Sequence, residues 1–578
     1  MSTRRRFIQT ASMAGLGLTL PTFPTSAAAP PKPDAFDGPV GVHHAFGPVP
    51  STDLNVGFSG GAAAVARVEY SPDESLTQTA TAEPLPLPGE ELVAYRAALR
   101  ELTPGETYHV QAFLDGERSP IFEVSTAPAD ATSFTVTAWG DHGVEDPRND
   151  YKRGSEQAAP NRELAASLDP DVHLGIGDIS YADGYPYTWD RYFDAHESFF
   201  GNTVQMTVPG NHELEPGQGF AQYDGRLNAL MPTGGDRVDH RWYEFRYGNT
   251  QFVGLNTAFD ACPLVNEEGN EYITRDADDT YCPGEFSTAI HARQYRFLER
   301  TLAVADADPR VTWIVCYHHS PVWTSGNHPP RRGIRESWGR LYDEYNVDLV
   351  LTGHNHSYER SLPIRNESPG AHGTTYVVNG TGGTSHYGFD TEEPPRWTVV
   401  RNNEHYGVTA LDVTEHRLNV SYITLDGTVL DEFAVLKDEF GRPTQADASV
   451  PLRVTDGSRS QGADAFTGDQ TARIELTVNA NTPVSAVRDA LPPGWRPIAG
   501  DHVASERHEG GGQHVFFEPA PDTFQALTYF AEAPSGPDAT GRYEFGPTVA
   551  RTPSSDWVRV PSTTETAVVA GPSTEVQR

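Results

Sequence analysis

The sequence predicts a multidomain protein in which a β-sandwich precedes an α/β domain and a small β-rich domain follows it. Three observations predict this order. Short apolar runs separated by turns fill residues 38–128, strand-like and helix-like runs alternate over 133–437, and short β-like runs with Gly/Pro/Asp-rich turns return over 448–572. At 578 residues the chain is also too long for a single hydrophobic core.

The two flanking regions are predicted to be β-sandwiches. The N-terminal region contains five β-like runs, at residues 53–58, 66–70, 92–98, 107–114 and 121–125. Its stretch Leu99–Thr107 (LRELTPGET) resembles the strand-to-strand corner of a fibronectin type III-like sandwich, which predicts that domain type for residues 38–128. The C-terminal sequence has no cluster of metal-ligating residues, so we interpret 448–572 as an accessory β-sandwich.

The central region is predicted to be α/β. Five apolar runs read as buried strands: Phe134–Trp139, Val172–Ile176, Val204–Val208, Val311–Tyr317 and Val347–Leu351. Three helix-like segments lead into later members of this set: Ser155–Leu168, Ala289–Val304 and Arg335–Tyr345. Long loops at 213–240 and 257–288 lie between these elements, and long loops in a compact domain usually carry function or specificity.

A polar motif follows each of the five predicted strands. The motifs are Gly140-Asp141-His142-Gly143, Gly177-Asp178-Ile179-Ser180-Tyr181, Gly210-Asn211-His212-Glu213, His318-His319-Ser320-Pro321 and Gly353-His354-Asn355-His356. Ligands of an open α/β sheet gather at the carboxyl ends of its strands. The sequence therefore predicts that these side chains converge on a two-metal site.

These five motifs, in this order, resemble the purple acid phosphatases of the calcineurin-like metallophosphoesterase superfamily. The resemblance covers residues 40–437 and includes Gly353–Arg360 and Tyr376–Gly382 (YVVNGTG). It implies a catalytic domain of two mixed sheets flanked by helices. It also implies a metal-dependent phosphoric ester hydrolase that contains Fe(III) and a divalent metal (Zn, Mn or Fe).

The resemblance also implies an allotment of ligands. Iron(III) would take Asp141, Tyr181 and His356, the divalent ion would take Asn211, His319 and His354, and Asp178 would bridge them. The allotment agrees with the preference of a hard trivalent ion for anionic oxygen. Many other branches of the superfamily have Asp-x-His at the first motif. Because position 143 is glycine here, Tyr181 can take the place of that histidine.

Either of the adjacent residues His318 and His319 could be the metal ligand that follows the fourth strand. In the family a second histidine lies nine residues beyond the ligand. Counting from His319 reaches His328, whereas counting from His318 reaches Asn327. The spacing favours His319, and His318 remains the alternative.

His212 and His328 are the predicted catalytic histidines. The resemblance implies that they bind the substrate phosphate and help to protonate the leaving group, while a metal-bound hydroxide attacks phosphorus. Plant relatives have a second histidine after the one that corresponds to His328, but position 329 is proline. This departure leaves open which histidine is the acid.

The N-terminal sequence predicts export. Residues 1–30 resemble a twin-arginine signal, with Arg4-Arg5-Arg6, an apolar stretch and the small residues Ala27–Ala29. We expect a secreted or cell-surface protein that is exported folded and has no stable membrane insertion after cleavage. In an oxidising compartment Cys262 and Cys282 could form a disulfide.

The amino-acid composition excludes some classes of binding partner. A net charge of −36 argues against a nucleic acid or an anionic membrane surface as a partner. The resemblance implies small-molecule phosphate esters as substrates, and the function predicted from it is an exported acid phosphatase that hydrolyses phosphomonoesters. A phosphodiesterase or nucleotidase on the same metal core is the alternative, and a non-catalytic surface binding protein is the alternative of another class.

Overall fold

The computed structural model describes most of the chain from residue 38 onward. The described residues are 38–89, 92–149, 153–232, 241–258, 288–370, 372–391, 394–437, 454–460, 465–467, 470–507, 512–519, 522–535, 539–551, 557–560 and 565–570. The predicted export signal and the predicted Cys262–Cys282 disulfide lie outside them. Among the described residues, no helix is both long enough and apolar enough to cross a membrane.

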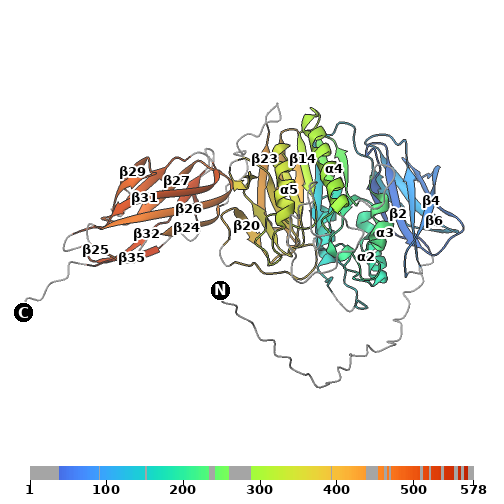
Figure 1. The fold of residues 1–578 in the computed structure, drawn as a ribbon, viewed down its shortest axis with the longest axis horizontal. Helices are drawn as coiled ribbons and strands as arrows, with labels where there is room; N and C mark the ends of the chain where they lie inside the picture. The colour runs from blue at the N-terminus through green and yellow to red at the C-terminus, as the bar shows by residue number, and fades with distance from the viewer. Residues whose placement is uncertain are drawn as a thin grey trace, which may run out of the picture. The chain divides into compact units, whose positions relative to one another are not determined.

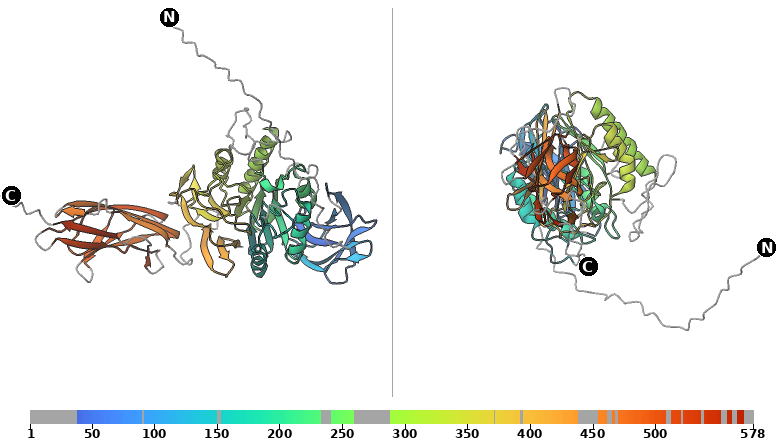
Figure 2. Two further views of the ribbon diagram at one scale, coloured as in Figure 1. Left: turned by 90° about the horizontal axis from the view of Figure 1, so that it is seen from below. Right: turned by 90° about the vertical axis from the view of Figure 1, so that its left-hand side faces the viewer.

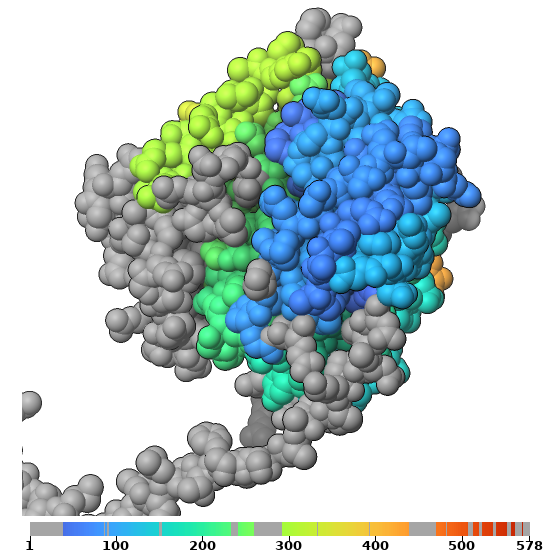
Figure 3. Space-filling model, turned by 90° about the vertical axis from the view of Figure 1, so that its right-hand side faces the viewer, coloured from blue at the N-terminus to red at the C-terminus, as the bar shows by residue number. Residues whose placement is uncertain are grey.

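The described residues before position 130 form eight strands, and Figure 3 shows one face of them. These are β1 (Val40–Phe46), β2 (Leu54–Gly60), β3 (Ala66–Ser71), β4 (Gln78–Pro86), β5 (Val93–Leu99), β6 (Thr107–Leu114), β7 (Glu117–Arg118) and β8 (Phe122–Ser125). Along β6 buried residues alternate with more exposed ones, as in a strand with one face on a core. The fibronectin type III-like assignment of this region remains a prediction.

Strand β1 connects this region to the α/β domain. It pairs antiparallel with β2 and parallel with β11 (Val204–Val208), so one continuous sheet crosses the predicted boundary. In the α/β domain this sheet contains β9 (Phe134–Trp139) and β10 (Val172–Ile176) beside β11. Its far edge is antiparallel and consists of β21 (Gly407–Val413), β22 (Arg417–Thr424) and β23 (Val429–Leu436).

A second mixed sheet completes the α/β domain. Its strand order is β12 (Tyr243–Tyr247), β13 (Thr250–Gly254), β14 (Trp313–Tyr317), β15 (Leu349–Thr352), β19 (Thr375–Asn379), β16 (Tyr358–Ser361) and β20 (Thr398–Asn402). Strands β13, β14, β15 and β19 are parallel, and their neighbours β12 and β16 are antiparallel to them. A small separate hairpin joins β17 (Ile364–Arg365) to β18 (Ser368–Pro369).

The helices cover the outer faces of the two sheets (Figures 1 and 2). The α-helices are α1 (Ala158–Ser167), α2 (Pro186–Phe200), α3 (Ala221–Arg226), α4 (Thr288–Ala307) and α5 (Arg332–Glu344), and the 3₁₀-helices are η1 (Asn211–Glu213) and η2 (Asn228–Leu230). Side-chain alternation along β14 shows the layering. Val315 packs between the sheets, whereas Ile314 and Cys316 pack with Leu298 of α4 and Leu341 of α5. The predicted fold of two mixed sheets flanked by helices is confirmed.

The C-terminal region is β-rich, as predicted. Its strands are β24 (Val454–Ser460), β25 (Ala465–Thr467), β26 (Thr471–Val484), β27 (Ala486–Leu491), β28 (Arg496–Gly500), β29 (Ala504–Arg507), β30 (Gln513–Phe517), β31 (Asp522–Glu532), β32 (Gly541–Phe545), β33 (Val549–Arg551), β34 (Val558–Arg559) and β35 (Glu565–Ala570). They form sheets of four, three and five strands around a core that includes Ile474, Trp495 and Tyr529.

Buried histidines in the layer between α2 and β10 predict acid sensitivity. Burial lowers the pKa of both His173 and His196 to about 3, so each stays neutral in the folded protein at pH values that protonate it in the unfolded chain. Because the unfolded state then binds more protons, stability falls as the pH drops from about 6.5 towards 3.

Replacing His196 by Phe tests this. The ring of His196 already stacks on Tyr192, and its Nε2 is buried with no hydrogen-bond partner among the described residues. Between pH 6 and 4, the free energy of unfolding of the α/β domain should decrease with falling pH in both proteins. In His196→Phe this decrease should be smaller than in the parent chain by about 1.4 kcal/mol per pH unit. Thermal melts over this range measure the difference, with exposed His416→Phe as control. Equal losses in His196→Phe and the parent would contradict the assignment.

Candidate metal centre

The five motifs lie in neighbouring loops, each of which follows a parallel strand. Strands β9, β10 and β11 end just before Asp141, Asp178 and Asn211, and β14 and β15 end just before His319 and His354. The two sheets are joined at this edge, because Nδ1 of His319 donates to the carbonyl of Ile176 at 2.8 Å. The loops of both sheets therefore surround one region, as the strand-end argument predicts.

The backbone around the centre is unusually tight. Asp141, Asp178, Tyr181 and His354 have positive φ angles of 58°, 50°, 54° and 67°, a region that non-glycine residues rarely adopt. A Cβ atom at Gly210 would lie 2.1 Å from Oδ1 of Asp178, and one at Gly353 would lie 2.5 Å from Oδ2 of Asp141. The glycines of these motifs are therefore needed because carboxylates pack directly against the backbone.

One group of donors contains Asp141, Tyr181 and His356. The hydroxyl of Tyr181 lies 3.0 Å from Oδ1 of Asp141 and 2.9 Å from Nε2 of His356, and that nitrogen lies 3.2 Å from the same carboxylate oxygen. Nδ1 of His356 is engaged by the carbonyl of Ser385, which leaves Nε2 to face the group. Burial, together with Asp141 and Asp178, raises the pKa of Tyr181 well above its ordinary value.

A second group contains Asp178, His319 and His354, and Asn211 follows strand β11 in the loop next to that of Asp178. Nε2 of His319 lies 3.1 Å from Oδ2 of Asp178, and ligand atoms of Asp178, His319 and His354 lie within 4.8 Å of one another. Nε2 of both histidines and Oδ1 of Asn211 are buried without a hydrogen-bond partner among the described residues. Buried polar atoms are costly when unpaired, so these donors fit a bound cation.

The electrostatics also favour a cation here. Burial opposes a charge on His319, but Asp178 and Asp141 outweigh burial and raise the pKa of His319 to about 10. The carboxylates thus stabilise positive charge at the place where the two donor groups meet.

His318 points away from both groups. Its Nδ1 donates to the carbonyl of Ser320 at 2.9 Å, and its ring lies edge-on to Trp338 of α5 at 5.5 Å. Burial lowers its pKa to about 3. Of the two candidates that the sequence left open, the structure brings His319 to the donor cluster and buries His318 beneath α5.

His212 lies beside the second donor group. Its backbone N–H donates to Oδ1 of Asp178 at 2.9 Å, and its Nε2 lies 3.9 Å from Oδ2 of that residue. Its other ring nitrogen, Nδ1, lies 2.5 Å from Oδ1 of Asp183. Burial opposes a charge on His212, but Asp178 and Asp183 raise its pKa above the ordinary value. Asp183 lies only five residues after Asp178, but it stands outside the five motifs that predict the site.

His328 lies on the other side of the cluster. Its ring is 4.4 Å from that of His354 and 5.2 Å from that of Tyr387, measured between centroids. Asn355, between His354 and His356, holds its backbone by accepting from the His328 N–H and donating to its carbonyl, both at 2.9 Å. Burial and the nearby His356 lower the pKa of His328.

Two further residues support the candidate metal centre but were not predicted from the sequence. Glu213 is buried and accepts hydrogen bonds from the backbone N–H groups of Asp178, Ile179 and Gly210 at 2.7–2.8 Å, so it fixes two of the motifs. Tyr387 stacks on His356 with centroids 3.8 Å apart. Glu213 stands within a motif and could have been found there, whereas nothing local distinguishes Tyr387 from the other 23 tyrosines.

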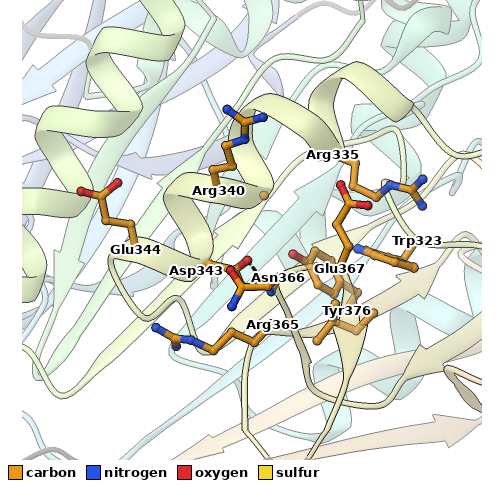
Figure 4. Close-up of a pocket in the computed structure, with 11 residues that line it drawn as sticks. Trp323, Arg335, Arg340, Asp343, Glu344, Arg365, Asn366, Glu367 and Tyr376 are labelled. Carbon is orange, nitrogen blue, oxygen red and sulfur yellow. Dashed lines mark hydrogen bonds between the residues drawn. The ribbon is translucent and has the colours of Figure 1, made fainter.

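A separate cavity of about 430 Å³ lies along α5 (Figure 4). Its lining includes Trp323 and Tyr376, and the guanidinium of Arg335 lies 4.5 Å above the Trp323 ring. None of the predicted site residues lines it. Three arginines and three carboxylates share the lining, so its charge selects neither an anion nor a cation.

Comparison with known families agrees with this geometry. The calcineurin-like phosphoesterase family profile matches residues 134–358, and the profile of the iron/zinc purple acid phosphatase-like protein C-terminal region matches residues 373–432. The fold and the site thus define a metallophosphoesterase. Residues 134–432 are thus similar to the purple acid phosphatase-like proteins of this family, and the chain is a phosphoesterase-type hydrolase.

Individual relatives support the same placement. Human acid phosphatase type 7 is 26% identical over 394 residues, which cover 61% of this chain and 79% of that protein. Probable inactive purple acid phosphatase 27 of Arabidopsis thaliana is 26% identical over 350 residues, 55% of this chain and 52% of that protein. A solved purple acid phosphatase from yellow lupin seeds shares the fold, with a TM-score of 0.56 and 22% identity over 69% of this chain and 74% of that one.

Proposed function

We propose that this protein is an exported acid phosphatase that hydrolyses phosphomonoesters at a dinuclear metal centre. Two adjacent donor groups are the observation that carries the proposal. Asp141, Tyr181 and His356 would hold Fe(III), because carboxylate and phenolate oxygens suit a hard trivalent ion. Asn211, His319 and His354 would hold Zn, Mn or Fe in the divalent state, and Asp178 would serve both ions. When bound, the metals supply charge for the phosphate oxygens and lower the pKa of water.

The histidines around the centre would handle the leaving group. His212 is held by Asp183 at Nδ1, so its Nε2 is oriented towards the side of the centre where Asp178 lies. The side chain of His212 is 17% exposed and His328 is half-buried, while His319 and Asp141 are fully buried. The substrate would therefore approach between His212 and His328, and one of them would donate the proton to the departing alkoxide oxygen.

The non-catalytic alternative is disfavoured by the same residues. A binding protein does not need seven metal donors together with two histidines that flank them. Export rests on the sequence pattern of residues 1–30 alone and is part of the proposal.

Turnover of p-nitrophenyl phosphate and bis-p-nitrophenyl phosphate by purified, metal-loaded protein tests the function. The proposal expects a much higher kcat/KM for the monoester. Preference for the diester would establish the phosphodiesterase alternative, and no turnover of either with metals bound would establish a binding protein.

A further inference from the structure

Arg153 lies at the edge of the metal centre on a fixed piece of backbone. The next residue, Gly154, forms an isolated β-bridge with Thr384, which in turn donates its hydroxyl to the carbonyl of Asp141. A Cβ atom on Gly154 would lie 2.1 Å from the carbonyl oxygen of Val144. Close packing therefore anchors the Arg153 backbone to the loop that carries Asp141.

The guanidinium group of Arg153 lies between two side chains of the site. Its Nε is 3.4 Å from Oδ2 of Asp183, and it also hydrogen-bonds the side chain of Tyr387. Asp183 contacts His212, and Tyr387 stacks on His356. Arg153 thus contacts both groups that flank the donor cluster, one from the loop after β10 and the other from the segment after β19.

The ion pair between Arg153 and Asp183 leaves much of the arginine side chain exposed. Oδ2 of Asp183 makes no hydrogen bond to a described residue, and the Arg153 side chain is 41% exposed. By contrast, the buried Arg360 forms two hydrogen bonds to Asp431, at 2.6 and 2.9 Å. Because a guanidinium has five N–H donors, Arg153 retains donors that face solvent beside the site.

We propose that Arg153 binds a second anionic group of the substrate. The preferred substrates are then phosphomonoesters whose leaving group carries a carboxylate or a second phosphate a few bonds from the ester. A planar guanidinium matches either group with paired hydrogen bonds, while the phosphate that is cleaved would lie at the metal centre that the donor residues hold. This inference rests on the proposed function and adds a substrate class to it.

Two substrates of equal size test the inference: 3-carboxyphenyl phosphate and 3-carbamoylphenyl phosphate, which differ in charge. Arg153→Gln should lower the kcat/KM preference for the carboxylate substrate by roughly 5- to 10-fold, mainly through KM, as expected for a half-exposed charge-assisted contact. Its kcat/KM for the carbamoyl substrate should stay within about twofold. Arg153→Lys should keep part of the preference, and the exposed Arg310→Gln is the matched control.

Equal losses for both substrates in Arg153→Gln would overturn the inference and show that Arg153 acts only by positioning Asp183 and His212. No loss for either substrate would overturn it as well. If the parent protein turns over neither substrate, the proposed function fails. Calorimetric binding of 3-carboxyphenylphosphonate and 3-carbamoylphenylphosphonate then decides the Arg153 contact separately.

Discussion

Replacing Asp178 by Asn is expected to lower kcat/KM for p-nitrophenyl phosphate by about 10³-fold or more. Asp178 lies 3.1 Å from Nε2 of His319, and both are buried, so no solvent ligand can readily take its place. An amide cannot supply the negative charge that two cations at one site require, and the lost charge stabilisation falls directly on the reacting phosphate. Steady-state kinetics and metal analysis of the same sample measure the effect.

The exposed Asp194 of α2 provides the matched control, because Asp194→Asn removes the same charge away from the site. Its activity should stay within about twofold of the parent. Added Zn²⁺ should raise the melting temperature of the parent and of Asp194→Asn more than that of Asp178→Asn, since a ligand stabilises only the state that binds it. Parental turnover in Asp178→Asn would rule out the proposed site.

The adjacent histidines should respond in opposite ways. His319→Gln is expected to lose metal and at least about 10²-fold in kcat/KM, because Nε2 of His319 belongs to the donor cluster. His318→Gln is expected to keep its metals and to stay within about fivefold in kcat/KM, because His318 packs under α5 with its Nδ1 on Ser320. Each variant is the other's control.

Metal content and kinetics are to be measured together for this pair. The opposite result, in which His318→Gln loses metal and His319→Gln retains it, would mean that the assignment of the two histidines is wrong. Equal metal loss in both would indicate a general disruption of the loop after β14 and would remove the distinction drawn between them.

The fold was predictable where burial dominates the sequence pattern. Strands β9, β10 and β11 begin and end where the apolar runs do, since both of their faces are covered. Strand β1 was missed because the buried His43 and His44 interrupt its apolar pattern. Helix α2 was missed although Trp189, Tyr192, Phe193 and His196 stand at helical spacing and are buried, so the signal was present in the sequence.

The site was predictable as far as its motifs extend. The ordered motifs contain the predicted donors, and the structure brings Asp178, His319 and His354 together and groups Asp141, Tyr181 and His356. The side chains that orient them come from elsewhere or act through the backbone. Arg153 and Tyr387 meet the site only because the segments after β9 and β19 fold against each other, and local sequence does not encode that contact. Which metals bind is likewise not determined by residue types alone, because His and Asp accept several ions.

The most direct test of the two-metal centre is the metal content and visible spectrum of purified, active protein. The proposal predicts two metal ions per chain, at least one of them iron, and a tyrosinate-to-Fe(III) charge-transfer band that disappears in Tyr181→Phe. Full phosphatase activity in a protein that holds one metal ion or none would contradict it.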